Sequence, residues 1–146
     1  MKEQHYQQLQ EHVLTETLDN GLKVVMIPKE NYHKTFAVLT TPFGSLDRHF
    51  KINNSEVIDI PSGTAHFLEH KLFEKESEDA FKRFGELGAD ANAFTTAYQT
   101  SYLFSTTDNF ELSLVHLLDF VQTPYFSLQT IAKEQGIIGQ EIQMYE

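Results

Sequence analysis

Two histidines and a glutamate in the middle of the chain have the spacing of a helical metal site. The segment reads His66-Phe67-Leu68-Glu69-His70. On an α-helix, residues i and i+4 lie about 40° apart around the axis, so the two imidazoles can converge on one ion. Two neutral imidazoles and a carboxylate suit Zn²⁺, which at catalytic sites keeps a fourth coordination position open for water.

The position of Glu69 predicts a hydrolytic reaction at this ion. Zinc makes water more acidic, and the Glu69 carboxylate can accept the proton before the oxygen attacks a carbonyl carbon. The order H-x-x-E-H is the inverted form of the usual zinc-peptidase helix motif. The alternative is a surface helix on which these residues coincide, although chance gives only about 0.03 such motifs in a chain of this composition.

A third protein ligand has to come from another element, and the chain has no cysteine to supply it. The last predicted helix carries Glu134 and Glu141, which are seven residues apart and therefore share one face. Gly136 and Gly139 lie in the same helix, where each costs about 1 kcal/mol relative to alanine. We expect such glycines where the backbone packs tightly against a neighbour, here the histidine-bearing helix. The alternative is that both carboxylates lie on a solvated face.

The elements that must position these side chains follow from turn signals and hydrophobic periodicity. Strands are predicted in a hairpin over 12–27 around Asn20-Gly21, over 35–41, over 56–60 as a short strand, and over 91–105 as two strands or a hairpin. Helices are predicted over 63–74, 77–87 and 110–121, and a last helix begins near 127 and still continues at 146.

The end of the last helix predicts the domain organisation. Residues 128–146 contain no C-cap signal, no following proline and no basic last turn. We therefore expect 1–146 to be a single domain that forms the N-terminal part of a longer protein.

The composition excludes several classes of protein. The chain has 146 residues, 40% of them hydrophobic, which is too many for a disordered chain. The formal net charge of −10 disfavours binding to nucleic acid or to an anionic membrane. There is no apolar run long enough for a bilayer, and the polar N-terminus does not have the pattern of a signal peptide. We predict a soluble, cytoplasmic protein.

Taken together, these residues resemble the N-terminal domain of the pitrilysin/insulinase family of zinc peptidases, which includes insulin-degrading enzyme and the mitochondrial processing peptidases. The resemblance covers almost the whole chain and is strongest to the branch found in Gram-positive bacteria. The matching segments, in the family's order and near its spacing, are Leu18-Asp19-Asn20-Gly21-Leu22, the motif at 66–70, Asn92-Ala93-Phe94-Thr95 with Thr100 and Tyr102, and Glu134 with Glu141.

The resemblance implies a role for each residue of the site. His66, His70 and Glu141 would be the ligands of one zinc ion per chain, and Glu69 would be the general base. Glu134 would support the site without binding the metal. The spacing from His70 to Glu141 is slightly shorter than in the best-known family members, and the pairing of the two last-helix glutamates supports the assignment.

The resemblance also implies a substrate-binding strand. The alternation over 91–97 places Asn92 on one face and Ala93 on the other. In the family the matching strand lies at the edge of the cleft and pairs with the substrate backbone, which assigns substrate binding to Asn92 and Ala93. The alternative is an ordinary sheet strand.

The implied fold is α+β, a mostly antiparallel sheet with helices packed on one face. The implied function is a zinc-dependent metalloendopeptidase that hydrolyses peptides or short proteins, working with the remaining domains of the full-length chain or with a homologous subunit. Two alternatives stay open: a non-catalytic or regulatory subunit of a peptidase pair, and a non-peptidic zinc hydrolase or lyase, although known lyases with this motif complete it with a cysteine. The 146-residue chain alone is expected to be a poor peptidase.

The remaining histidines have no ligand-spaced partners in the sequence. They are His5, His12, His33, His49 and His116. His116 lies in the middle of an apolar helix, where we expect a partly buried, hydrogen-bonded side chain.

Overall fold

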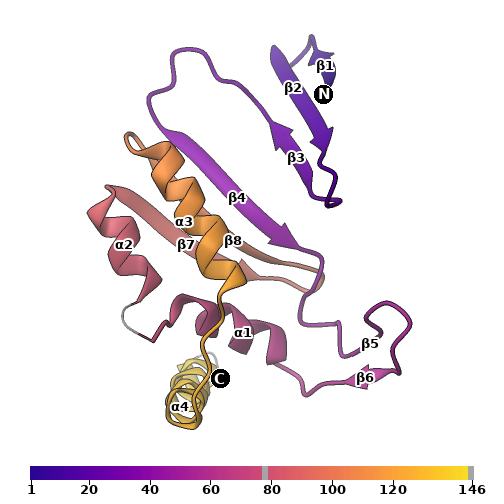
Figure 1. The fold of residues 1–146 in the computed structure, drawn as a ribbon, viewed down its shortest axis with the longest axis vertical. Helices are drawn as coiled ribbons and strands as arrows, with labels where there is room; N and C mark the ends of the chain where they lie inside the picture. Colours follow the sequence, from indigo (N-terminus) through magenta and orange to yellow (C-terminus); the bar gives the residue numbers. More distant parts are fainter. Residues whose placement is uncertain (77–78, 145–146) are drawn as a thin grey trace. The chain divides into compact units, whose positions relative to one another are not determined.

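The structure is a computed structural model that describes residues 1–76 and 79–144. The chain divides into two compact units, Met1–His33 and Lys34–Glu146 (Figure 1). Among the described residues, no helix has the length and apolar character needed to cross a membrane.

The first unit is a three-stranded antiparallel sheet in the order β1-β2-β3. Its strands are β1 (Lys2–Tyr6), β2 (Glu11–Thr17) and β3 (Lys23–Met26). The predicted hairpin is confirmed: β2 and β3 pair across a turn in which Gly21 has a φ of +86° and donates its N–H to the Leu18 carbonyl at 2.8 Å. A positive φ of this kind favours glycine because it has no Cβ.

Strand β1 was not predicted from the sequence. All five of its residues are exposed, so the segment has no alternation of apolar and polar positions to reveal it. It forms by backbone pairing with β2, and the register places His5 directly opposite His12, with Glu3 nearby. The expectation that His5 and His12 have no ligand-spaced partners is therefore wrong, because strand pairing brings together residues that are distant in sequence.

The second unit is built on a sheet in the order β4-β8-β7, with all neighbours antiparallel. Its strands are β4 (Thr35–Thr41), β7 (Ala89–Thr95) and β8 (Thr100–Thr106), and a separate short pair joins β5 (His49–Phe50) to β6 (Ile58–Asp59). These strands confirm the predicted strand over 35–41, the hairpin over 91–105 and the short strand over 56–60. Strand β5 was not predicted, since its region reads as a polar loop.

The helices of the second unit are α1 (Thr64–Phe73), α2 (Ala80–Glu86), α3 (Phe110–Gln122) and α4 (Leu128–Met144). The predicted helices agree with them to within a few residues. Ser77 and Glu78, expected to begin the second helix, and the predicted continuation of the last helix over 145–146 lie outside the described residues.

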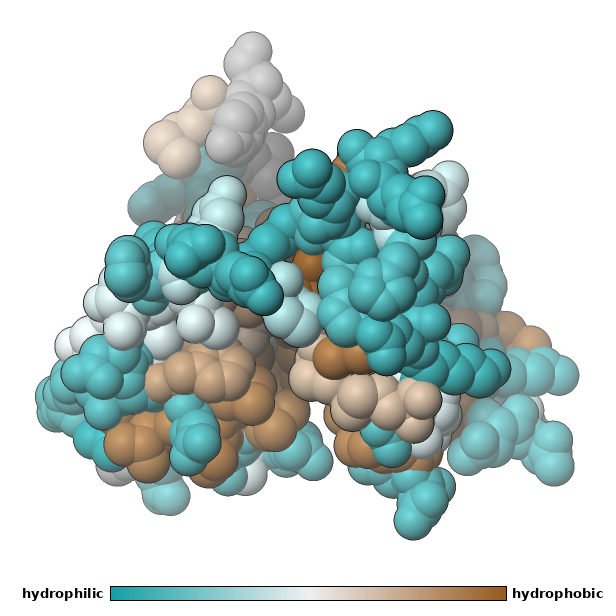
Figure 2. Space-filling view, turned by 90° about the horizontal axis from the view of Figure 1, so that it is seen from above, coloured by the Kyte–Doolittle hydropathy of each residue, from teal (hydrophilic) through white to brown (hydrophobic). Residues whose placement is uncertain are grey.

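One face of the sheet packs against helices α1, α2 and α3 around an aromatic core. Phe104 and Tyr102 of β8 are almost fully buried there, and the ring centroids of Phe73 and Phe120 lie 4.9 Å apart. On β4, Phe36 and Val38 alternate with this face and are 59% and 48% exposed. Figure 2 shows apolar residues gathered in patches among polar ones on one face of the molecule. The sheet of this unit is thus antiparallel with helices on one face, as the α+β prediction requires.

Local interactions set where the helices begin and end. Helix α1 follows Gly63, which has a φ of +86°, and α2 is capped by Asp79, whose carboxylate accepts the Phe81 N–H at 2.7 Å. At the C-terminal end of α3, the ammonium group of Lys75 donates to the carbonyl of Thr123 at 2.7 Å. Burial lowers the pKa of Lys75, an effect that the nearby Asp119 carboxylate partly offsets.

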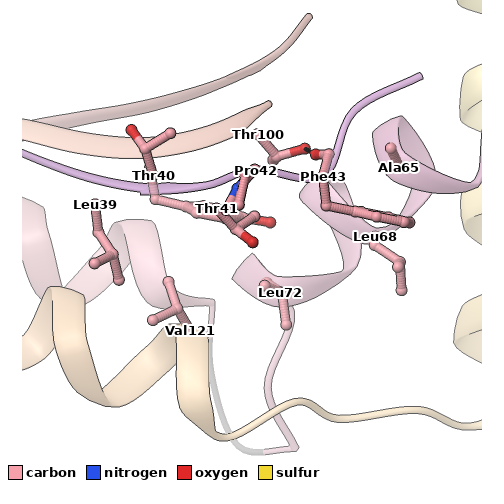
Figure 3. Close-up of a pocket in the computed structure, with 11 residues that line it drawn as sticks. Leu39, Thr40, Thr41, Pro42, Phe43, Ala65, Leu68, Leu72, Thr100 and Val121 are labelled. Atoms are coloured by element: carbon pink, nitrogen blue, oxygen red, sulfur yellow. Dashed lines mark hydrogen bonds between the residues drawn. The ribbon is translucent and has the colours of Figure 1, made fainter. Parts of the chain in front are cut away.

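Helix α1 presents two different faces. Ala65, Leu68 and Leu72 line an apolar pocket that is completed by residues of β4 and α3, including Leu39 and Val121 (Figure 3). At 100° per residue, the histidines of the motif lie on the opposite side of the helix from this apolar stripe. Packing of the stripe on the sheet therefore fixes where both imidazoles point.

The isolated histidine of α3 has the environment predicted for it. His116 is half-buried, and its Nε2 atom lies 3.0 Å from the carbonyl oxygen of Ala80. This contact joins α3 to the first residue of α2, so His116 is a structural residue.

Candidate metal centre

Helices α1 and α4 bring His66, His70 and Glu141 together. One ligand atom from each residue lies within 4.8 Å of the other two, and His66 Nε2 is 3.7 Å from Glu141 Oε2. A tetrahedral zinc ion with bonds of about 2.0–2.2 Å separates its ligand atoms by about 3.4 Å. These donors are of the types that zinc prefers and lie near the required separation, so the residues fit a zinc ion.

Glu134 fixes the orientation and tautomer of His70. The Glu134 Oε1 atom lies 2.7 Å from His70 Nδ1. An ionised carboxylate can only accept hydrogen bonds, so Nδ1 carries the proton and the lone pair is on Nε2. Glu134 is buried, which protects this bond from competing water. A carboxylate that holds a ligating imidazole in this way also makes it a better ligand.

Glu69 is held between α1 and the sheet. It is only 8% exposed, and the hydroxyl of Thr95 on β7 donates to Glu69 Oε2 at 2.5 Å. Thr100, opposite Thr95 on β8, donates in turn to the Phe43 carbonyl at 2.8 Å. Among the described residues, Thr95 is the only one that donates a hydrogen bond to this carboxylate, which leaves Oε1 able to accept a proton.

The Glu69 carboxylate also acts on the core tyrosine of β8. Burial raises the pKa of Tyr102, and the negative charge of Glu69 raises it further. Tyr102 therefore keeps its proton over the whole neutral and mildly alkaline range.

A buried lysine joins the two helices of the site. Lys71 on α1 has no exposed surface, and its ammonium group contacts Glu74 and donates to Thr130 Oγ1 at 2.8 Å. Thr130 lies in the first turn of α4, where it also bonds to Ser127. The hydrogen bond from Lys71 to Thr130 holds the beginning of α4 against α1 and so helps to position Glu134.

Two glycines of α4 do not have the environment predicted for them. A Cβ atom added at Gly136 or Gly139 would meet nothing within 4 Å. The prediction of tight backbone packing at these positions is wrong for the described residues. Helix α4 meets α1 through side chains instead, by way of Thr130 and the two glutamates.

The candidate substrate strand is at an edge of its sheet. Strand β7 pairs with β8 alone among the described strands. The hydrogen bond from Thr96 N–H to the Gln99 carbonyl, at 2.8 Å, closes the hairpin between β7 and β8. Hydrogen-bonded and non-hydrogen-bonded residue pairs alternate along an antiparallel ladder, so the backbone N–H and C=O of Ala93, three residues earlier, point away from β8. The outward N–H of Ala93 donates to Asn92 Oδ1 at 2.8 Å.

The candidate site opens to solvent on the side of its first histidine. The side chains of His66 and Glu141 are 41% and 33% exposed, whereas those of His70 and Glu134 are 23% and 11% exposed. Solvent can therefore reach the site from this side. Three glutamates in so small a region also give it a negative charge that favours a cation.

Sequence reasoning did not identify two contributors to this arrangement. Thr95 lies in a segment that matched the family, but nothing in the sequence indicates its bond to Glu69. Lys71 follows the motif directly, and a lysine is ordinarily expected on the surface. The periodicity of α1 places Lys71 about 100° around the helix from His70, so it flanks the face that carries the histidines. A third ligand from another helix at that face would also have implied a neighbour for Lys71.

Residues 59–146 match the family model described as insulinase (peptidase family M16), which accounts for more than half of the chain. The chain belongs to this family. The matched region contains both helices of the candidate site, together with β7 and β8.

Individual relatives agree with the assignment. An uncharacterized zinc protease of Bacillus subtilis (strain 168), YmfH, is 53% identical over 142 residues, which cover 97% of this chain and 33% of that protein. The structure of an M16-like peptidase from Alicyclobacillus acidocaldarius matches with a TM-score of 0.86 and 42% identity over 92% of this chain and 31% of the other. Pitrilysin has the same fold, with a TM-score of 0.72 at 21% identity over 92% of this chain and 14% of its own. The chain thus spans about a third or less of the length of these proteins.

Proposed function

We propose that this chain is the metal-binding part of a zinc-dependent metalloendopeptidase that hydrolyses peptides or short proteins. The observation that carries the proposal is the convergence of His66, His70 and Glu141 next to the held carboxylate of Glu69. The names of its relatives as zinc proteases support the same activity.

In this proposal His66, His70 and Glu141 hold the zinc ion. When bound, zinc supplies Lewis acidity, which acidifies water and polarises a peptide carbonyl. Glu134 keeps the His70 ring in the orientation and tautomer that present its Nε2 lone pair.

Glu69 is proposed as the general base and Thr95 as the residue that positions it. The carboxylate accepts the proton of the attacking water at Oε1 and can return it to the leaving amine. The Thr95 hydroxyl donates to Oε2 and so restrains the position of the carboxylate relative to β7.

Strand β7 is proposed to hold the substrate as an added strand. The outward carbonyl of Ala93 offers an acceptor to a peptide. Its N–H, which donates to Asn92 Oδ1 here, would become available as a donor when the Asn92 side chain turns to contact the peptide backbone. Pairing through backbone groups is largely independent of the substrate's side chains, which favours broad specificity.

The other partners are proposed from the length of the relatives. The peptide would be enclosed by the remaining domains of a full-length chain or by a homologous subunit. That the protein has no nucleic-acid or membrane partner, and that it is cytoplasmic, stay predictions from the sequence.

Metal analysis of purified variants tests the ligand assignment. Each of His66→Ala, His70→Ala and Glu141→Gln should remove one equivalent of zinc relative to the wild type, or weaken its binding strongly, because the tetrahedral site loses a protein ligand. His49→Ala, an exposed histidine in the same unit, is the matched control and should bind as the wild type does. Wild-type zinc content in both histidine variants would refute the assignment.

Activity of the full-length protein tests the role of Glu69. Glu69→Gln should keep its zinc but lose about 10²–10⁴-fold in peptide hydrolysis, since an amide cannot accept the proton. Glu76→Gln, on an exposed residue of the same region, should leave the rate unchanged. Unaltered turnover in Glu69→Gln would place the base elsewhere, and a wild type with no peptidase activity would favour the non-catalytic alternative.

A further inference from the structure

We propose a second metal site in the N-terminal unit, formed by Glu3, His5 and His12 and suited to a borderline divalent cation such as Zn²⁺, Ni²⁺, Co²⁺ or Cu²⁺. Pairing of β1 with β2 brings these residues together. His5 lies directly opposite His12 in the register, and Glu3 precedes His5 by two residues, which puts both on the same face of β1.

The three side chains converge on one point. The Glu3 Oε1 atom is 3.0 Å from His5 Nε2 and 2.5 Å from His12 Nε2. The two imidazole rings are stacked, with centroids 4.3 Å apart and planes inclined by 7°. One ligand atom from each residue lies within 4.8 Å of the others. Both contacts of Glu3 are shorter than the about 3.4 Å between ligands of one tetrahedral ion, so the exposed Glu3 side chain would turn outward to admit the ion.

The Nε2 atom of His12 indicates a missing ligand. The atom is buried, and it makes no hydrogen bond among the described residues although Glu3 Oε1 lies beside it. Buried ring nitrogens are usually satisfied, and an ion is one of the few explanations for an exception. A metal ion between the nitrogens and the carboxylate would use this lone pair.

The donor set selects the class of ion. Two imidazoles and a carboxylate favour Zn²⁺ and the later first-row divalent ions over Mg²⁺ and Ca²⁺, which prefer oxygen alone. The side chains of His5 and Glu3 are 67% and 54% exposed, so further coordination positions would be filled by water.

Such an ion would join β1 to β2. None of the residues of β1 is buried, and the strand is therefore held to its sheet mainly by backbone hydrogen bonds. Because Glu3 and His5 lie on β1 and His12 lies on β2, a bound ion would stabilise the pairing of these strands.

Titration of the chain with Zn²⁺ or Ni²⁺ at pH 7.5 tests the site. The double variant His66→Ala/His70→Ala, which removes the other candidate site, should still bind one equivalent. Adding His12→Ala should abolish this binding or weaken it at least tenfold, and adding Glu3→Gln should weaken it. Adding His33→Ala, an exposed histidine of the same unit, should leave it unchanged.

Hydrogen exchange gives a second readout. The amides of β1 should exchange more slowly when the metal is present, and this protection should be lost with His12→Ala. Absence of binding in the double variant, or binding that persists with His12→Ala, would overturn the proposal. The proposed function is tested separately by the double variant His5→Ala/His12→Ala, which should retain one equivalent of zinc at the candidate site on α1 and α4. If this variant bound no zinc, the result would contradict that site and not the one on β1 and β2.

Discussion

At the scale of single residues, the three glutamates around the candidate site differ in their surroundings. Glu69 is buried between its own helix, α1, and the sheet, where Thr95 donates a hydrogen bond to it. Glu134 is bonded to the imidazole of His70, and Glu141 lies near His66 and is partly exposed to solvent. These surroundings are consistent with the three proposed roles of proton acceptor, orienting group and ligand, although all three side chains have the same chemistry in solution. The proposed roles therefore follow from the environment that the fold gives each carboxylate.

The orienting role of Glu134 leads to a prediction about zinc affinity. Glu134→Ala should weaken zinc binding about 10–100-fold, because His70 loses the partner that fixes its tautomer and ring orientation. Competition with a chromogenic chelator measures the change. Gln135→Ala, at an exposed position of the same helix, should bind zinc with wild-type affinity. Equal affinities for the two variants would contradict the role.

Tyr102 leads to a prediction about alkaline stability. Its pKa is raised by burial and by Glu69, so above about pH 10 the unfolded chain loses this proton while the folded chain keeps it. The unfolded state then binds fewer protons, and the free energy of unfolding falls by up to about 1.4 kcal/mol per pH unit. Denaturant titrations between pH 9 and about pH 11 should show a shallower fall for Tyr102→Phe. Identical slopes for both proteins would refute the shift.

The sequence specified some of these residues and left others undetermined. His66, Glu69 and His70 could be predicted because the periodicity of one helix fixes their relative positions. Glu134 and Glu141 required knowledge of which helix packs on which, and it came from the family resemblance. Thr95 and Lys71 could not be predicted, because their roles depend on contacts between elements that no local pattern encodes.

At the scale of elements, the site depends on the position of α4 relative to α1. Side-chain contacts from Lys71 to Thr130 and from His70 to Glu134 hold the two helices together. The local patterns predicted both helices well, since capping and periodicity are local properties. The same reasoning failed for β1, which is polar throughout and exists because β2 offers it a partner.

The glycines of α4 lead to a prediction about helix stability. Gly136→Ala should raise the free energy of unfolding by about 1 kcal/mol, because alanine favours the helix and its Cβ would meet no other atom. Thermal or urea unfolding of the 146-residue chain measures the effect. A destabilised variant would show that this face of α4 is packed more tightly than the structure indicates.

The loop after β4 leads to the opposite prediction. A Cβ atom at Gly44 would lie 2.5 Å from backbone atoms of Thr96, Tyr98 and Gln99. Gly44→Ala should therefore destabilise the chain by about 1–3 kcal/mol, because rigid backbone must move to admit the methyl group. The loop also donates the Ser45 N–H to the Thr96 carbonyl at 2.9 Å, so the end of the β7–β8 hairpin should loosen. Urea unfolding measures the loss, and unchanged stability would contradict the close approach.

At the scale of the whole molecule, the chain contains the candidate site but spans only 33% of its Bacillus subtilis relative. The edge of β7 is unpaired among the described strands, and the apolar side chains of Phe36 and Val38 are exposed on β4. Exposed strand edges and apolar surface of this kind favour association with other protein. The second unit therefore contains all three proposed ligands but does not itself enclose the candidate site.

This arrangement predicts that the 146-residue chain hydrolyses peptides poorly even when it holds zinc. The proposed base and ligands are present, but rate also depends on holding the peptide in a reactive geometry, which can contribute about 7–11 kcal/mol. Within the described part of the second unit, the edge of β7 would have to do this without an opposing wall to exclude water or to stabilise the developing oxyanion. Assays of the chain and of the full-length protein on one quenched fluorescent peptide, at equal zinc occupancy, should differ by about 10²-fold or more. Equal rates would mean that the site is self-sufficient and that enclosure contributes nothing to catalysis.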